Sequence, residues 1–297
     1  MSVAIIGGGA VGLLFSYYFT KNVADTVVYV RRKEQAELLN RSGLKLYQEG
    51  TLREVKVLAK VLKEEGDIKA DLVIVAVKQY DLRNLSEVLR NRVPRTAKLL
   101  FIQNGMSHIP FLETLPQGCI YVGIVDHGAL KIAEHKVEHT GKGLMKLAAF
   151  RGNLEAVTPM LENLDQTRFP IEFKDDWYPL LAEKLLVNAV INPLTALYHV
   201  ENGTLIENDY FLENMKNLFE EAFEALGLDD KAKRWEDVVS ICRQTARNRS
   251  SMLRDIEMGQ STEIDAISGY LLQRSVSANL RMPYTRFVYN GIKGMSS

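Results

Sequence analysis

A glycine-rich turn near the start of the chain constrains the fold more than any other feature of the sequence. Residues 2–6 form a short, mostly apolar run, and residues 13–21 have the pattern of a helix. Between them lie Gly7, Gly8, Gly9, Ala10, Val11 and Gly12. The glycines match G-x-G-x-x-G, a turn that lets a pyrophosphate approach the backbone at the N-terminus of a helix. Because the motif connects a strand to a helix, it predicts a dinucleotide-binding domain of the Rossmann type.

The residues after the second predicted strand indicate which dinucleotide binds. Residues 26–30 form this strand, and Arg31 and Arg32 follow it. An Asp or Glu near this position usually accepts a hydrogen bond from the ribose of NAD, whereas a guanidinium pairs with the 2′-phosphate of NADP. The sequence therefore favours NADP (NADPH) as the cofactor. The alternative is that both arginines are simply solvated at a strand end.

The rest of the first half continues the α/β pattern. Residues 71–77 are almost entirely apolar, which is typical of a strand covered on both faces in a parallel sheet. We predict a hairpin within 43–61, a helix at 153–164, and strands at 98–102, 119–125, 136–139, 144–150 and 170–173, the last three of which complete the sheet. Ligands of such sheets bind beyond the carboxyl ends of the strands, where Lys78, Asn104 and a turn at His127 lie. For His127 we favour a loop histidine with satisfied hydrogen bonds over a ligand contact.

Helical periodicity replaces the strand pattern after residue 174. Predicted helices cover residues 177–198, 209–226, 235–247, 262–278 and 283–293, with Asp209 as an N-cap and Gly227 as a C-cap. The expected architecture is therefore an α/β N-terminal Rossmann-type domain, residues 1–174, followed by an all-α C-terminal domain, residues 175–297.

The first helix of the second half carries an unusual polar stripe. Lys184, Asn188 and Asn192 are spaced four residues apart in an otherwise apolar run. At about 3.6 residues per turn, each step of four drifts by only about 40°, so the three side chains share one face. Burying an ammonium group without a partner is costly, which suggests that Lys184 reaches an anion, a carboxylate or a cleft. Alternatively, Lys184 extends to solvent and the asparagines bond to neighbouring helices. Pro193 is expected to kink this helix or to end its regular part after Asn192.

Two later segments carry further polar groups. Ser251 lies at an apparent helix start, where free N–H groups suit a carboxylate, although simple N-capping is the interpretation that we prefer from the sequence alone. Glu263 precedes an apolar helix and could pair with a buried cation.

Composition narrows the classes of partner. The 37 basic and 37 acidic residues cancel, so the overall charge favours neither nucleic acid nor an anionic membrane. Cys119 and Cys242 have no spacing typical of metal ligands or of a disulfide framework, and we predict no metal site. There is no pattern of a signal peptide, and we predict a cytoplasmic protein that does not associate with membranes. A homodimer is left open, since an apolar helical face can close on its own chain or on another subunit.

Five segments taken together resemble one enzyme family. They are GGGAVG, VKQYD, QNGM, EKLLVNAVINPLTAL and RSSMLRDIEMGQSTEID, in this order and over nearly the whole chain. The set resembles 2-dehydropantoate 2-reductases, also called ketopantoate reductases. The resemblance implies reduction of 2-dehydropantoate to pantoate with NADPH, a step toward pantothenate and coenzyme A.

The resemblance also implies roles for individual residues. Lys184 corresponds to the proton donor, and the substrate contacts correspond to Asn104, Asn188, Asn192, Asn202 and Ser251. The cofactor contacts correspond to Lys78, Asn104, Ala129 and Glu263. The loop 126–129 departs from the family, which would have a threonine before His127 and an alanine after it. Two alternatives remain open: a reductase of another branched 2-oxo acid, and a redox sensor that binds NADPH without catalysis.

Overall fold

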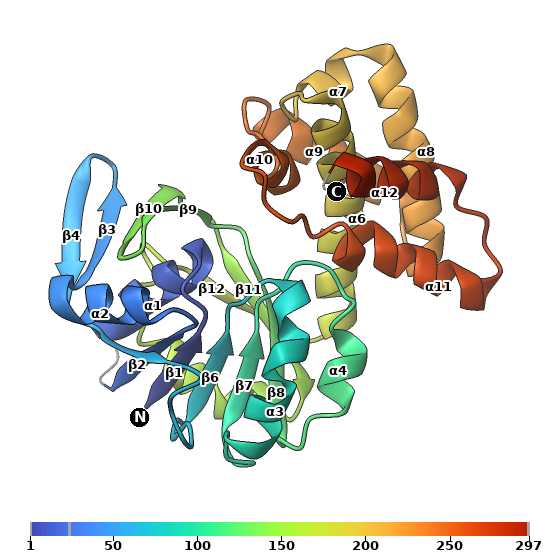
Figure 1. Ribbon diagram of the computed structural model, residues 1–297. Coiled ribbons are helices and arrows are strands. Elements are labelled where there is room, and N and C mark those ends of the chain that lie inside the picture. Colours follow the sequence, from blue (N-terminus) through green and yellow to red (C-terminus); the bar gives the residue numbers. More distant parts are fainter. Residues whose placement is uncertain (1, 23–24, 296–297) are drawn as a thin grey trace. The chain divides into compact units, whose positions relative to one another are not determined.

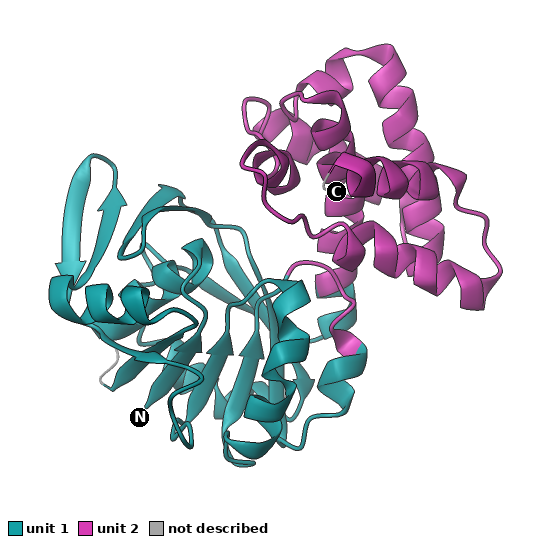
Figure 2. Cartoon of the chain, in the orientation of Figure 1, with its two compact units in different colours: residues 1–103, 110–180 teal, residues 104–109, 181–297 magenta. Residues whose placement is uncertain are grey.

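The computed structural model describes residues 2–22 and 25–295, and it divides the chain into two compact units. The first unit contains residues 1–103 and 110–180, and the second contains residues 104–109 and 181–297 (Figure 2). The first unit holds all the strands of the two sheets, and the second is helical (Figure 1). The α/β and all-α fold classes predicted from the sequence are therefore confirmed. The domain limits at residues 174 and 175 stay a prediction.

The main sheet of the first unit has eight strands in the order β12-β11-β8-β7-β6-β1-β2-β5. All neighbouring strands are parallel except β8 and β11, which are antiparallel. The bounds are β1 (Val3–Ile6), β2 (Thr26–Val30), β5 (Leu58–Val61), β6 (Leu72–Val75), β7 (Lys98–Phe101), β8 (Cys119–Val125), β11 (Met145–Arg151) and β12 (Ile171–Lys174). The four residues of β6 and of β1 are all buried, as expected for central strands of a covered parallel sheet.

A second sheet has four strands in the order β4-β3-β10-β9. Its strands are β3 (Leu44–Gln48), β4 (Thr51–Val55), β9 (Gly128–Ala133) and β10 (Lys136–Gly141). The predicted hairpin is present as β3 and β4, but β10 does not complete the main sheet as we had expected. The predicted turn at His127 connects β8 to β9, and β9 itself, whose Gly128 and Ala129 pair with β10, was not predicted.

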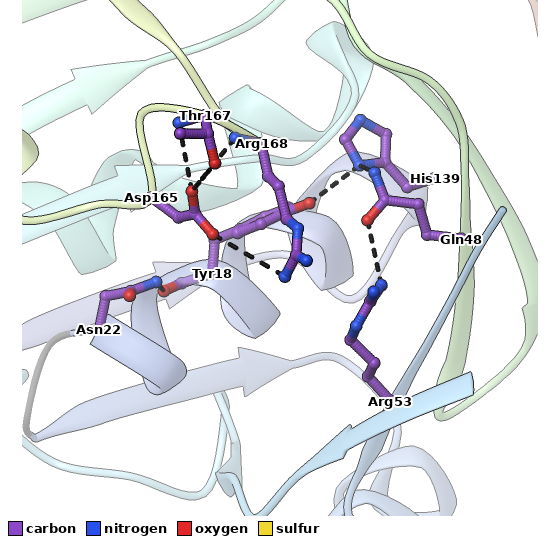
Figure 3. Close-up of polar contacts among 8 residues, drawn as sticks. All are labelled: Tyr18, Asn22, Gln48, Arg53, His139, Asp165, Thr167 and Arg168. Carbon is purple, nitrogen blue, oxygen red and sulfur yellow. Dashed lines mark hydrogen bonds and ion pairs between the residues drawn. The ribbon is translucent and has the colours of Figure 1, made fainter. Parts of the chain in front are cut away.

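Helix α1 (Ala10–Asn22) contacts strands of both sheets, which explains its composition (Figure 1). Every residue from Gly12 to Phe19 is buried, so the helix is apolar nearly all round rather than on one face. Within this stretch, Ser16 Oγ donates to the Gly12 carbonyl oxygen at 2.6 Å, and the Tyr18 hydroxyl lies 3.0 Å from His139 Nδ1 of the second sheet. Gln48 Nε2 lies 3.2 Å from the same nitrogen, so that α1 and the second sheet share one hydrogen-bonded cluster (Figure 3).

The remaining helices of the first unit are short. They are α2 (Lys33–Ser42), the 3₁₀ helix η1 (Gln79–Leu85), α3 (Ser86–Asn91), α4 (Ile109–Glu113, which extends into the second unit), the 3₁₀ turn η2 (Leu154–Ala156) and α5 (Thr158–Leu161). The single helix predicted at 153–164 is therefore wrong. Asn153 caps η2 by accepting from Ala156 N, and Pro159 at the start of α5 restarts the helical turn, so the segment forms two separate turns.

The second unit contains most of α6 (Trp177–Tyr198), whose residues from 181 onward belong to it. Its other helices are α7 (Thr204–Glu207), α8 (Asp209–Leu226), α9 (Lys231–Gln244), α10 (Ser251–Glu257), the π-helix η3 (Asp265–Gly269), α11 (Tyr270–Ala278) and α12 (Pro283–Met295). Among the described residues, α6 is the one helix long and apolar enough to cross a membrane, and most of its apolar window is buried within the protein.

Several helix ends differ from the predictions. Gly227 is confirmed as the C-cap of α8, with φ 61° and ψ 40°. The N-cap of α8 is Asn208 and not Asp209, because Asn208 Oδ1 accepts from the backbone N–H groups of Tyr210 and Phe211. Helix α6 continues through Pro193 to Tyr198, so the regular helix does not end after Asn192. Buried packing on both sides of Pro193 outweighs the loss of one backbone donor.

Candidate active site

The glycine turn between β1 and α1 is closed tightly against the main sheet. Gly7 has φ 129°, and a Cβ atom there would lie 2.7 Å from the Ala76 carbonyl oxygen. A Cβ atom on Gly12 would lie 2.0 Å from the Gly7 carbonyl oxygen. Both positions therefore require glycine to bring the helix onto the strand.

The middle of the same turn is open. A Cβ atom on Gly9 would meet no atom within 4 Å, and Gly9 is exposed. The carbonyl oxygen of Gly8 accepts from Gln35 Nε2 at 2.9 Å, which fixes the turn from the other side. Ala10 and Val11 begin α1, whose first N–H groups have no partner within the helix. The turn thus offers space and donors for an anionic group, and its residues fit a dinucleotide pyrophosphate.

The two arginines after β2 differ in their surroundings. The Arg32 guanidinium forms an ion pair with Glu134, and Lys131 Nζ donates to the same carboxylate at 2.9 Å. Arg31 is exposed and forms no ion pair with any described residue. The carboxylate of Glu134 therefore competes with any phosphate for Arg32 and leaves Arg31 as the available guanidinium.

Two more residues expected at the cofactor lie in the first unit. Lys78 follows β6 and occupies the N-cap position of η1. Ala129 lies in β9, opposite His139 of β10, and is partly buried against the core. Neither placement tests the role that the resemblance implies.

His127, next to Ala129, is buried within the first unit. Its Nδ1 accepts from Gly143 N at 3.1 Å and lies 2.9 Å from His139 Nε2. The ring also stacks on Phe169 with a centroid distance of 4.3 Å. Burial lowers the pKa of His127 to about 4, with a smaller contribution from His139, so the ring is neutral near pH 7. These contacts support a structural role, although Nε2 has no partner among the described residues.

In the second unit, the polar stripe lies on α6 as predicted. Asn188 is 8% exposed and Asn192 is 7% exposed, whereas Lys184 is half-buried. Leu185, Leu186, Ala189, Val190 and Ile191 around them are buried. The lysine is thus the most accessible of the three side chains of the stripe.

Asn104 and Glu263 are brought together within the second unit, although 159 positions separate them in the sequence. Asn104 Nδ2 donates to Glu263 Oε2 at 2.9 Å. Asn104 is exposed, whereas Glu263 is only 6% exposed and lies just before the π-helix η3. Gly105 has φ 76°, and its Cβ would lie 2.2 Å from the Ala266 carbonyl oxygen. Glycine at this position therefore lets the loop approach η3.

Asn202 contacts the segment that connects α9 to α10, and Ser251 is the first residue after that segment. Asn202 is buried, and its Nδ2 donates to Thr245 Oγ1 at 2.9 Å. The N-cap of α10 is Ser250, whose Oγ accepts from Leu253 N at 3.1 Å. Capping therefore accounts for Ser250 and leaves the exposed Ser251 hydroxyl outside the cap.

Sequence reasoning missed three residues that support these side chains. They are Gly105, which lets its loop approach Ala266, and Thr195 and Ser250, whose hydroxyl oxygens lie 2.8 Å apart. In the sequence these residues lie in the short segments Q-N-G, N-P-L-T and R-S-S, which do not indicate which distant residue each one contacts. Among residues 2–22 and 25–295, no group of three or more His, Cys, Asp and Glu side chains is arranged to hold a metal ion.

Both halves of the chain match models of one protein family. Residues 3–152 match "Ketopantoate reductase PanE/ApbA", and residues 176–296 match "Ketopantoate reductase PanE/ApbA C terminal". The 2-dehydropantoate 2-reductase of Bacillus subtilis is 42% identical over 99% of this chain and 97% of its own length. The enzyme of the same name from Listeria monocytogenes is 37% identical, with the same coverage of both chains.

Solved structures show the same fold. The crystal structure of a probable 2-dehydropantoate 2-reductase from Bacillus subtilis has a TM-score of 0.91 at 40% identity, covering 99% of this chain and 100% of the other. At lower identity the likeness concerns the fold alone. A D-mandelate dehydrogenase with NADH and anilino(oxo)acetate has a TM-score of 0.90 at 20% identity, covering 100% and 98% of the two chains. A dimeric ketopantoate reductase from Staphylococcus aureus has a TM-score of 0.84 at 21% identity, covering 100% and 99%. With two family models matching most of its length and a close relative along all but a few residues, the chain belongs to the ketopantoate reductase family of oxidoreductases.

Proposed function

We propose that this protein reduces 2-dehydropantoate to pantoate with NADPH, a step toward pantothenate and coenzyme A. The observation that carries the proposal is the stripe of Lys184, Asn188 and Asn192 on α6, in a chain that belongs to this family over both halves. A non-catalytic sensor would have no need for an accessible lysine aligned with two buried amides.

Lys184 is the proposed general acid. During reduction of a 2-oxo acid, negative charge develops on the oxygen of the C2 carbonyl. A protonated ammonium group within hydrogen-bond reach stabilises this charge and then delivers the proton. Asn188 and Asn192, on the same face of α6, would orient the substrate through their amides and supply no charge.

The proposed cofactor residues are those of the glycine turn, together with Arg31, Lys78, Asn104, Ala129 and Glu263. NADPH, when bound, supplies the hydride for the C2 carbonyl. The open space at Gly9 and the start of α1 would receive the pyrophosphate, and Arg31 would pair with the 2′-phosphate. Arg32 would contribute less, because Glu134 already pairs with it.

The substrate is the least constrained part of the proposal. A D-mandelate dehydrogenase shares this fold, so the fold by itself does not determine which 2-oxo acid is reduced. A reductase of another branched 2-oxo acid is therefore the alternative to test.

We also propose a cytoplasmic homodimer, since a family member of the same fold is dimeric and the helical unit exposes Tyr210 and Phe287. Sedimentation of the purified protein would test the oligomeric state.

The decisive experiment follows NADPH oxidation in a single turnover with 2-dehydropantoate, for the parent and for Lys184→Ala. General-acid catalysis typically contributes about 10² to 10⁴ in rate, and we expect a loss in this range. Lys216→Ala is the control, because Lys216 is an exposed lysine on α8 of the same unit. A Lys184→Ala rate within about tenfold of the parent would refute the assigned role. Equal turnover of other branched 2-oxo acids, or equal use of NADH, would refute the proposed substrate or cofactor.

A further inference from the structure

The connector between α9 and α10, residues 245–250, lies against the loop that carries Asn202. The backbone N–H of Asn202 donates to the Asn248 carbonyl oxygen at 3.0 Å, and that of Gly203 donates to the Ala246 carbonyl oxygen at 2.9 Å. A Cβ atom on Gly203 would lie 2.7 Å from Ala246 Cβ. Glycine at position 203 thus permits an approach that a larger residue would prevent.

Thr245 determines how the Asn202 amide is oriented. The Thr245 hydroxyl donates to the Ile241 carbonyl oxygen at 2.6 Å. Its single hydrogen is used there, so towards Asn202, at 2.9 Å, the Thr245 oxygen can only accept. The NH₂ group of Asn202 must therefore face Thr245, and the orientation of the amide is not free.

The other end of the connector is joined to α6 through two buried hydroxyls. Thr195 Oγ1 and Ser250 Oγ lie 2.8 Å apart, and Thr195 is fully buried. The Thr195 hydroxyl also faces the carbonyl oxygens of Ile191 and Asn192, at 2.8 and 3.0 Å. One hydrogen cannot serve all three acceptors. The Ser250 oxygen can accept from both Thr195 Oγ1 and Leu253 N, since a hydroxyl oxygen has two lone pairs.

Through these contacts, three proposed substrate residues are connected to residues 245–250. Asn192 lies on α6 at the carbonyl that Thr195 contacts, Ser251 follows Ser250 in the chain, and Asn202 is held by Thr245. Thr195 is buried and Thr245 is partly buried, and removal of either hydroxyl takes a hydrogen-bond partner from a buried residue, Ser250 or Asn202. A shift in the connector would move amides and a serine hydroxyl, but not Lys184, which lies more than two turns of α6 away from Thr195.

We propose that Thr195 and Thr245 are positioning residues for the substrate, which align Asn192, Asn202 and Ser251 through the connector. The inference rests on the proposed function, because that proposal makes the three residues substrate contacts. It assigns to the connector an effect on substrate affinity that is separate from binding at the glycine turn, since the hydrogen-bond partners given above for Thr195 and Thr245 belong to the second unit and the glycine turn belongs to the first.

The test compares Thr195→Val and Thr245→Val with the parent. Valine keeps the branched shape and removes only the hydroxyl. Three quantities are measured for each variant: KM and kcat for 2-dehydropantoate, the Kd for NADPH by fluorescence titration, and the thermal midpoint. Thr195→Ser and Thr245→Ser restore the hydroxyl. Thr285→Val is the matched control, because Thr285 is buried in α12 of the same unit and its Oγ1 has no hydrogen-bond partner among the described residues.

We expect both valine variants to raise KM about tenfold, the ratio that corresponds to about 1.4 kcal/mol. The Kd for NADPH should stay within about twofold of the parent, the serine variants should restore most of the affinity, and Thr285→Val should change neither constant.

An unchanged KM in both valine variants overturns the assignment, as does an equal rise in KM and in the Kd for NADPH, which would show a general loss of structure. If one valine variant fails to fold, the other decides. A parent that reduces no 2-oxo acid overturns the proposed function and this assignment together, whereas an active parent with unaffected variants overturns this assignment alone.

Discussion

Gly9→Ala separates cofactor binding from folding, because the structure leaves the Cβ position of Gly9 empty. The added methyl group would meet no protein atom within 4 Å, and the backbone there is not in the left-handed region. Replacing glycine by alanine at a compatible position stabilises a protein by about 0.4–1 kcal/mol. Gly9 immediately precedes α1, however, and alanine is a poorer N-cap than glycine, which costs up to about 1 kcal/mol. The two effects oppose each other, and we expect the free energy of unfolding to change by less than about 1 kcal/mol.

The same methyl group would occupy the space proposed for the pyrophosphate. If it displaces one charge-assisted hydrogen bond, worth about 1.5–3 kcal/mol, the Kd for NADPH should rise about 10- to 150-fold. The assays are urea unfolding of the protein without ligand and fluorescence titration with NADPH. The control is Gly118→Ala, another exposed glycine whose Cβ would meet no atom within 4 Å, located at the other end of the strands, just before β8.

Gly12→Ala should show the opposite pattern. Its methyl group would lie 2.0 Å from the Gly7 carbonyl oxygen, and overpacking of this kind typically costs about 1–3 kcal/mol. Stability should therefore fall for Gly12→Ala and not for Gly9→Ala. An unchanged Kd for NADPH in Gly9→Ala, or a loss of stability as large as that of Gly12→Ala, would refute this account of the turn.

Three further outcomes follow from individual contacts. Arg31→Ala should raise KM for NADPH but not for NADH, and Arg32→Ala should have a smaller effect because Glu134 already pairs with it; steady-state kinetics with both cofactors would show a reversed order if this is wrong. Asn208→Ala should lower the free energy of unfolding by about 0.5–2 kcal/mol, and urea unfolding of Asp209→Ala should show a clearly smaller loss, since Asn208 is the N-cap of α8. Burial lowers the pKa of His127 from 6.5 to about 4, so the folded state resists the proton that the unfolded chain accepts. Its contribution to stability is complete above pH 6.5 and is lost as the pH falls through about 4, and unfolding curves for His127→Asn should depend less on pH in that interval.

The elements best predicted from the sequence are those whose pattern is set by burial on all sides. The central strands of the main sheet and the helices α6 and α8 agree with the predicted ranges to within a residue or two, because long apolar or strictly periodic segments have few alternative structures. Gly227 was predicted for the same reason. A glycine directly after the last periodic residue suits the left-handed C-cap that the structure shows.

The errors arose where local signals conflict or where the partner is distant in sequence. Residues 153–164 have helical composition, but Pro159 lies inside the segment and splits it into two turns. The membership of β10 in a second sheet depends on pairing with β3, about 90 residues earlier in the chain. Period-2 alternation predicts a strand and its inward face, but it carries no information on which sheet the strand joins.

In the candidate site, too, local features could be predicted from the sequence and tertiary contacts could not. The stripe on α6 is a local property, since a spacing of four places Lys184, Asn188 and Asn192 on one face wherever the helix lies. The other contacts of the candidate site are tertiary: Asn104 with Glu263, and Thr195 with Ser250. In the sequence they are single polar residues near a glycine, a proline or a second serine. Such combinations also occur in ordinary caps and turns. A sequence can therefore indicate which residues act on the substrate, whereas the residues that orient them become visible only when the hydrogen of each buried hydroxyl is assigned to an acceptor.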